Sequence, residues 1–213
     1  MLKPSIGLFL LATGILCAVA PSVVAYLIFV ANVAVHPAWY LLVQFLAIAA
    51  LLGAGAAILL YPLLFLFRSA RNLANKLLIV AVAIVAANSI SLFFCQRIEN
   101  SALESLITRS EPLVKAILQF ESSNHKPPKA LQQLVPQYIG RVPATGIKYW
   151  PSYEYKIFTD KEFVKHRWEL RIKCNTTDLS PSYLFYWPTQ KYPDWLNERL
   201  VTKMRSWGHV HFD

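Results

Sequence analysis

Residues 77–100, LLIVAVAIVAANSISLFFCQRIEN, contain the boundary that decides the fold. The run from Leu77 to Cys95 carries no charge, and Glu99, the first acidic residue of the chain, follows four positions later. A bilayer core needs about 20 apolar residues in one helix, because each residue adds roughly 1.5 Å of rise. This stretch therefore predicts a membrane-spanning helix that ends where a water-soluble region begins.

The chain before this stretch is almost free of charge. Only four of its 21 basic residues and none of its 12 acidic residues lie before Arg97. Two more uncharged runs, residues 5–34 and 37–67, are long enough to cross a bilayer. Backbone groups in lipid must bond within their own segment, so each run is predicted to be an α-helix. We predict a three-helix transmembrane domain over residues 1–96.

The basic residues of this half predict its orientation. Arg68, Arg71 and Lys76 share the short linker 67–76, whereas the linker around His36 contains no Lys, Arg, Asp or Glu. Because cytoplasmic loops are enriched in Lys and Arg, we expect linker 67–76 and the N-terminus with Lys3 in the cytoplasm. Three crossings then place residues 97–213 in the periplasm, and the whole chain in a bacterial inner membrane.

The first apolar run has an alternative interpretation as a cleaved signal peptide. Ala18-Val19-Ala20 matches the small-residue pattern of a cleavage site. Pro21 follows directly and the apolar run continues beyond it, which favours a helix that is retained.

Polar residues are few within the three runs. The absence of Asp, Glu, Lys, Arg and His inside them disfavours a channel, pump or transporter, whose pathways use such groups. Small residues at 53–57 predict close approach of one helix to another. Asn88-Ser89-Ile90-Ser91 predicts ordinary helix packing or, alternatively, a polar contact with a partner helix.

Residues 97–213 begin with helical patterns. Residues 99–108 form an apolar-striped segment that either stands alone or continues the third span. Ser110 followed by Glu111-Pro112 is typical of a helix start, which predicts a helix over 110–124. Leu131, Leu134 and Val135 predict a second, short helix over 129–138.

Strand patterns follow these helices. Residues 164–174 alternate between apolar and charged side chains, which predicts a strand with one buried and one wet face. Residues 153–157 and 183–187 predict two more strands, and residues 193–207 a closing amphipathic helix stopped by Gly208. The fold class expected is therefore three transmembrane α-helices plus an α+β extracytoplasmic domain, residues 97–213, with a helix packed on a small antiparallel sheet.

Residues 113–143 carry a family resemblance. An apolar-striped helix ends at Phe120, and a turn, a Leu-x-x-Leu segment at 131–134, Tyr138 and Pro143 follow. This order resembles type IV pilin-like proteins and the major pseudopilins of type II secretion. No prepilin cleavage motif precedes the third apolar run. The resemblance therefore implies a pilin-like domain on a polytopic membrane anchor.

Tyr and Trp are concentrated in residues 149–207. They predict either an interface for a protein, sugar or peptidoglycan partner or the core of a small domain. The candidate partner-binding residues are Trp150, Tyr153, Arg167, Arg171, Tyr186, Trp187 and Trp195.

No metal, cofactor or catalytic site is expected. His209 and His211, with Asp213 nearby, are too few for a zinc site and are expected at the surface. His166 lies on the apolar face of its strand, which favours a core histidine. Cys95 and Cys174 are expected either to form a disulfide or, for Cys174, to pack as a buried thiol.

Three functions remain open at this point. The leading one is a non-enzymatic inner-membrane protein that uses its pilin-like domain to bind another envelope component, as an accessory subunit of a complex. The second is an immunity-type membrane protein that blocks a toxin. The third is an envelope enzyme acting on lipid or cell wall, which would use Glu121, His125, His166 and Asp178. Membrane lipid and an envelope protein are the expected partners, and nucleic acid is not.

Overall fold

The computed structural model describes residues 4–158, 167–174, 182–190 and 201–211. The chain forms two compact units, Met1–Asn100 and Ser101–Asp213, each of which is described by itself. The boundary expected after residue 96 and the division after Asn100 both fall within helix α3, which spans Arg71–Asn124.

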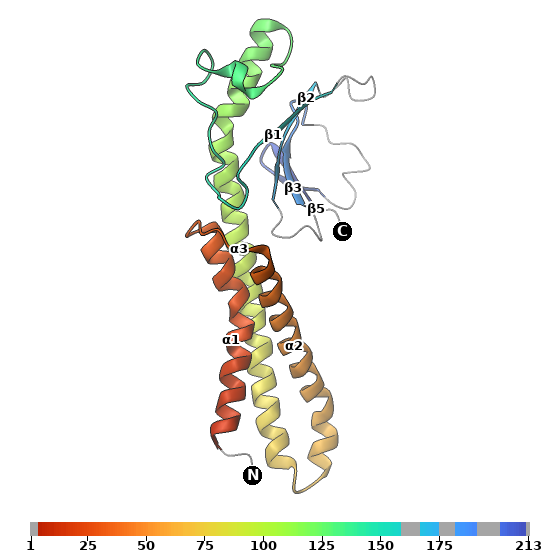
Figure 1. Ribbon diagram of the computed structural model, residues 1–213. Helices are drawn as coiled ribbons and strands as arrows, with labels where there is room; N and C mark the ends of the chain where they lie inside the picture. Colours follow the sequence, from red (N-terminus) through yellow and green to blue (C-terminus); the bar gives the residue numbers. More distant parts are fainter. Residues whose placement is uncertain (1–3, 159–166, 175–181, 191–200, 212–213) are drawn as a thin grey trace. The chain divides into compact units, whose positions relative to one another are not determined.

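Unit 1 is helical (Figure 1). It contains α1 (Pro4–Phe29), α2 (Pro37–Leu66) and the first part of α3, and all three helices are long and apolar enough to cross a membrane. The start of α2 has a clear local cause. The His36 side chain accepts a hydrogen bond from the backbone N–H of Ala38, and Pro37 occupies the first turn, where its missing N–H costs nothing.

Small residues fill the contacts between these helices. Ala54 of α2 packs with Ala81 and Ile84 of α3, and a Cβ atom at Gly14 of α1 would press on the Ile84 side chain. Gly53 and Gly55 face open space, so the close approach predicted for residues 53–57 comes from its alanines. Asn88 is buried and donates to the Ile84 carbonyl of its own helix, as ordinary packing requires.

The helix start predicted at Ser110 is wrong. Helix α3 continues without interruption through Pro112 to Asn124, as the alternative for residues 99–108 expected. Ser110 is fully buried, and its hydroxyl bonds the Leu106 carbonyl at 2.7 Å within the helix and the Tyr153 hydroxyl at 3.0 Å. The Ser110 hydroxyl, which would otherwise cap a new helix, is therefore engaged by Tyr153 and by the preceding turn of α3.

Unit 2 contains a five-stranded antiparallel sheet in the order β1-β2-β3-β5-β4. Its strands are β1 (Glu154–Ile157), β2 (Trp168–Lys173), β3 (Ser182–Tyr186), β4 (Val201–Met204) and β5 (Trp207–His211). The described parts of the three predicted strands are confirmed. The alternation of β2 is confirmed too, with Trp168, Leu170 and Ile172 fully buried, although Glu169 on the opposite face is also buried.

The helix predicted over residues 193–207 is wrong for its described part. Residues 201–211 form a hairpin whose two strands are joined by Arg205 and Ser206. Residues 193–200, including Trp195, lie outside the described residues. Strand β5 is internal to the sheet, so His209 is buried, contrary to the surface position expected for it.

The second predicted helix is also shorter than expected. Only a 3-10 turn, Leu131–Leu134, forms within residues 129–138, and it buries both of its leucines. The Gln133 side chain accepts a hydrogen bond from the backbone N–H of Lys129 and so closes this turn at its start.

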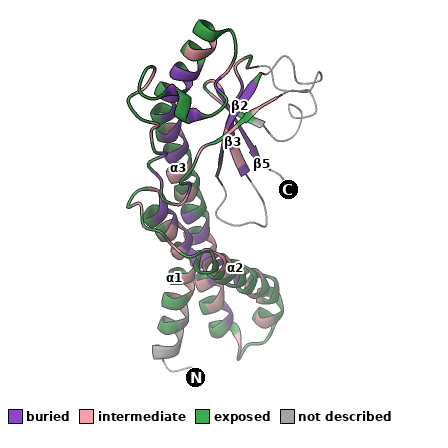
Figure 2. Ribbon diagram, turned by 45° about the horizontal axis from the view of Figure 1, so that its top comes forward, coloured by how far each residue is buried: buried purple, intermediate pink, exposed green. Residues whose placement is uncertain are grey.

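The core of unit 2 lies between α3 and the inner face of the sheet. Buried α3 residues recur at helical spacing, and Figure 2 shows the buried strands of the sheet in the same unit. These α3 residues are Leu103, Leu106, Ile107, Leu113, Ala116 and Ile117. Hydrogen bonds join α3 to Tyr153 just before β1, to Trp168 of β2 and to Arg205 in the β4–β5 turn, and they fix the two layers together.

Candidate functional site

An aromatic row crosses the inner face of the sheet. Tyr155 of β1, Trp168 of β2, Tyr186 of β3 and Trp207 of β5 follow one another with ring centroids 6.0, 5.6 and 5.4 Å apart. Offset and tilted aromatic pairs stabilise a core by about 1 kcal/mol each beyond burial alone. The row explains why this small domain is rich in large rings.

Glu121, in the last turn of α3 before its end, joins the helix to β2. Its carboxylate accepts a hydrogen bond from Trp168 Nε1 at 2.9 Å and pairs with Arg167 Nη1 at 3.5 Å. The same Arg167 nitrogen donates to the His125 carbonyl at 3.2 Å, just beyond the helix. A cation at this position satisfies a terminal carbonyl and complements the helix dipole.

Tyr155 lies beside this carboxylate in an apolar setting. Burial raises the pKa of Tyr155, and the Glu121 charge raises this pKa further. Its hydroxyl is buried without a hydrogen-bond partner among the described residues. Tyr153, just before β1, differs because its hydroxyl forms a hydrogen bond with Ser110. Burial raises the pKa of Tyr153, and this hydrogen bond opposes the rise.

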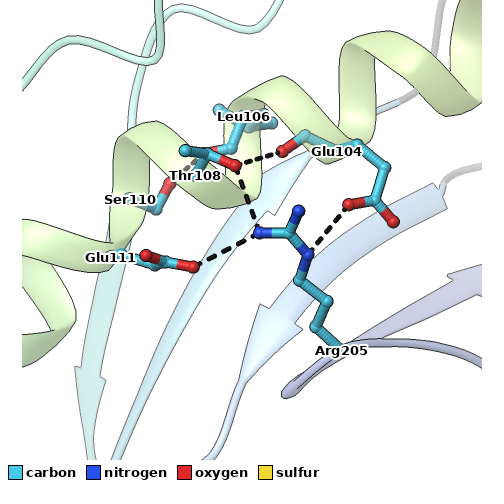
Figure 3. Close-up of polar contacts among 6 residues, drawn as sticks. All are labelled: Glu104, Leu106, Thr108, Ser110, Glu111 and Arg205. Atoms are coloured by element: carbon cyan, nitrogen blue, oxygen red, sulfur yellow. Dashed lines mark hydrogen bonds and ion pairs between the residues drawn. The ribbon is translucent and has the colours of Figure 1, made fainter.

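Arg205 holds the β4–β5 hairpin on α3 (Figure 3). Its Nε lies 3.1 Å from a Glu104 carboxylate oxygen, and its Nη1 donates to Thr108 Oγ1 at 3.2 Å and Glu111 Oε1 at 3.4 Å. The three acceptors lie on one face of α3 because their spacing matches the helical repeat. Arg205 itself has a positive φ of 55°, which a two-residue hairpin turn requires.

A second arginine fixes the loop before the sheet. Arg109 of α3 donates to the Thr145 carbonyl at 3.3 Å, and its guanidinium occupies the place where a Cβ atom of Gly146 would be. Gly146 has a φ of 78°, so both its backbone and the arginine require glycine there.

The outer face of the sheet has two different zones. On β3 and β5, Phe185 and Val210 are buried, and the Phe185 ring covers Gly208. On β1 and β2 the face is charged and largely exposed, and we call this the charged zone: Glu154, Lys156, Arg171 and Lys173. In this zone Arg171 Nε pairs with Glu154 at 2.6 Å and with Glu169 at 3.8 Å, and the Arg171 guanidinium lies 5.3 Å from the Tyr183 ring centre.

The structure separates the predicted partner-binding residues into two groups. Trp150 and Tyr186 are buried in the core, as the alternative interpretation held. Trp187 is buried too, but its Nε1 donates at 2.7 Å to Glu169 on the opposite face of the sheet. Burial raises the pKa of Tyr186. Tyr153 is half-buried against Ser110. Arg167 and Arg171 remain accessible at the surface, and Trp195 lies outside the described residues.

The residues of the enzyme hypothesis are only partly described. Glu121 and His125 lie near each other through Arg167, but His166 and Asp178 lie outside the described residues. Within the described ranges, no three His, Cys, Asp or Glu side chains are placed to hold a metal ion. None of the three cysteines forms a disulfide in the structure, and Cys174 is buried, as the buried-thiol alternative expected.

Glu154, Glu169 and Arg205 organise this region and were missed at the sequence level. Each acts through a partner more than ten residues away, and a single sequence offers no direct signal for such pairs. The alternation in residues 201–211 was the available signal for a hairpin, but the helical spacing of its large residues concealed it.

Comparison of the chain with models of known protein families, with curated proteins and with solved structures found no match. The conclusions that follow therefore depend on the residues and geometry described above.

Proposed function

We propose that this chain is a non-enzymatic protein of a bacterial inner membrane whose pilin-like periplasmic domain binds another envelope protein. In this proposal unit 1 anchors the protein in the membrane, and unit 2 presents the charged zone to the partner. The chain then acts as an accessory subunit of a larger membrane complex.

The location is supported by the three apolar helices and by their loop charges. Arg68 lies in the turn between α2 and α3, and Arg71 and Lys76 lie in the first two turns of α3; the positive-inside rule favours the cytoplasm for this end of the helices. Two reporter fusions after residue 213 test this orientation. We expect alkaline phosphatase to be active there and green fluorescent protein to be non-fluorescent. The opposite pattern would overturn the orientation.

The single observation that carries the binding proposal is the charged zone. The titratable side chains at the seam between α3 and the sheet, Glu121 and Arg205 among them, are engaged in holding the fold. Glu154, Lys156 and Lys173 lie on the sheet face opposite the core, on β1 and β2, and are exposed there, although Glu154 also pairs with Arg171. Exposed charged groups on a rigid element are suited to partner selection and to fast association.

The pilin-like character is supported by the arrangement within unit 2. A long helix packs on one face of an antiparallel sheet, and the segment with the family resemblance, residues 113–143, lies between the helix and the first strand. This is the order of elements that the resemblance implies.

Site-specific photo-crosslinking in intact cells tests the proposal. A photoreactive amino acid at Lys156 or Lys173 is expected to capture one discrete envelope protein. The matched control position is Gln132, which is also exposed but lies in the 3-10 turn Leu131–Leu134 and not in the sheet.

Charge reversal then tests whether the captured contact is specific. The double variant Lys156→Glu/Lys173→Glu is expected to lose co-purification of the partner in mild detergent, whereas Lys115→Glu/Lys126→Glu keeps it. Equal capture from all positions, or a protein that always purifies alone, would contradict the proposal.

A further inference from the structure

Residues 67–76 comprise the turn after α2 and the first six residues of α3, and we call this segment the turn. It concentrates positive charge at the end of two apolar helices. Arg68, Arg71 and Lys76 are all exposed, and no ion pair among the described residues involves any of them. No acidic residue occurs before Glu99, so this cluster has no internal counter-charge nearby in the sequence.

Two hydrogen bonds hold this turn in a defined conformation. Arg71 Nε donates to the Phe65 carbonyl at 3.0 Å, and its guanidinium lies 5.0 Å from the Phe65 ring centre. About one helical turn deeper, the Tyr61 hydroxyl donates to Asn75 Oδ1 at 3.2 Å and joins α2 to α3. The outer nitrogens of Arg71 are thereby oriented before any ligand arrives.

We propose that this turn, residues 67–76, binds the phosphate groups of anionic phospholipids. Its height in the bilayer follows from the sequence, because the apolar run of α2 ends at its C-cap residue Phe67 and Arg68 is the next residue, at the level of the headgroups. A planar guanidinium that is already fixed matches a phosphate in two-point contact. The proposal requires only that unit 1 lies in a bilayer, so it can hold even if the proposed partner binding fails.

The expected effect is a preference among lipids. A basic residue near an anionic surface contributes about 1 kcal/mol, which corresponds to roughly fivefold in affinity per charge. The test is native mass spectrometry of the full chain, purified in a neutral detergent and offered equimolar dioleoyl phosphatidylglycerol and dioleoyl phosphatidylcholine. Wild-type protein is expected to retain phosphatidylglycerol at least tenfold better.

Three variants make the result specific. Arg68→Gln/Lys76→Gln keeps the Arg71 bond to Phe65 and is expected to lose most of the preference, and addition of Arg71→Gln is expected to abolish it. The matched control Lys115→Gln/Lys126→Gln/Lys203→Gln removes the same charge from exposed positions of unit 2 and keeps the preference. Circular dichroism verifies that each variant retains its helices.

Three outcomes would overturn the proposal. Equal retention of the two lipids by wild type, or an unchanged preference in the triple turn variant, would show that the turn does not select headgroup phosphate. Displacement of phosphatidylglycerol by millimolar inorganic phosphate would assign the turn to a free anion instead of a lipid.

Discussion

The two units of this chain distribute apolar side chains in opposite ways. In unit 1 the largest ones face outward, with Leu59 and Leu66 each more than 70% exposed, while Ala18, Ala74 and Ala81 are buried. In unit 2 the large rings and branched side chains are inside. Figure 2 shows the contrast as mostly exposed helices in one unit and mostly buried strands in the other.

The contrast follows from the solvent that each unit meets. Lipid tails are as apolar as leucine, so helices in a bilayer gain little by burying leucine and associate through close contacts of small residues. In water, burial of apolar surface contributes about 25 cal/mol per Å², so unit 2 places its largest rings inside. The same residue type therefore has different energetic consequences in the two halves.

The largest effect is expected from Trp168→Ala in unit 2. Removal of this fully buried ring should lower the free energy of unfolding by about 3–5 kcal/mol and leave Glu121 without its indole donor. The measurement is urea unfolding of the full chain in detergent, followed by protection of unit 2 from protease. Leu59→Ala, at an outward position of α2, should change little, and a comparable loss in both variants would contradict the contrast.

An intermediate effect is expected from Ala81→Leu in unit 1. The added volume must fit between α2 and α3 beside Ala54, so we expect a loss of about 1–3 kcal/mol. The measurement is the thermal midpoint in detergent. Gly55→Leu adds more volume, but toward open space, and is expected to leave the midpoint almost unchanged.

A smaller effect is expected from Arg205→Ala. Exposed ion pairs contribute about 0.2–1 kcal/mol, and this side chain is about half exposed. The substitution should speed hydrogen exchange of the β4–β5 backbone amides. In the wild type, 1 M NaCl should have the same effect, because salt screens the ion pairs of Arg205. Lys203→Ala on the same hairpin is the control, and equal exchange in both variants would refute the role of the α3 contacts.

The smallest effect is expected from Tyr155→Phe. Its hydroxyl has no partner among the described residues, so stability at neutral pH should stay the same or rise by less than about 1 kcal/mol. The Tyr155 pKa is raised in the folded state, so the unfolded chain ionises first, near pH 10. The contribution of neutral Tyr155 to the free energy of unfolding is therefore fully present below about pH 10. It is lost as the pH rises above that value toward the pKa of the folded state.

Alkaline unfolding monitored by circular dichroism checks this sign. Tyr155→Phe should unfold at a higher pH than the wild type. Part of the loss of stability at alkaline pH should remain, because the pKa values of Tyr153 and Tyr186 are also raised in the folded state. Tyr153→Phe removes a hydrogen bond to Ser110 and should instead cost about 1 kcal/mol at neutral pH. Identical behaviour of the two variants would contradict the different settings of these hydroxyls.

Local patterns predicted much of the fold. The three apolar helices follow from long uncharged runs, and strand β2 follows from the alternation of apolar and charged side chains. Both patterns are visible among residues close together in the sequence. The errors occurred where a distant partner decides the outcome. Pro112 is typical of a helix start, but α3 continues through it, because buried residues on both sides of it, such as Ile107 and Leu113, pack in the core of unit 2. Residues 201–207 have helical spacing, but β3 pairs with β5 and imposes a hairpin.

The sequence predicts which region contains the candidate site, but not which of its side chains face the core and which face outward. Aromatic density indicated residues 149–207, yet only the register of the sheet separates Tyr186 on the core face from Arg171 on the opposite face. Burial then decides which of them a partner can reach. That register depends on pairs such as Leu170 with Tyr186, which are set by long-range contacts.

The aromatic row has a spectroscopic consequence. Trp168, Tyr186 and Trp207 come from three different strands, and their neighbouring rings lie 5.6 and 5.4 Å apart. Transition dipoles at such separations couple, so the native sheet should give a strong near-ultraviolet dichroic band and short-range quenching of tryptophan emission. Both signals vanish when the strands separate, which provides a label-free reporter of sheet integrity even with the protein embedded in detergent or lipid.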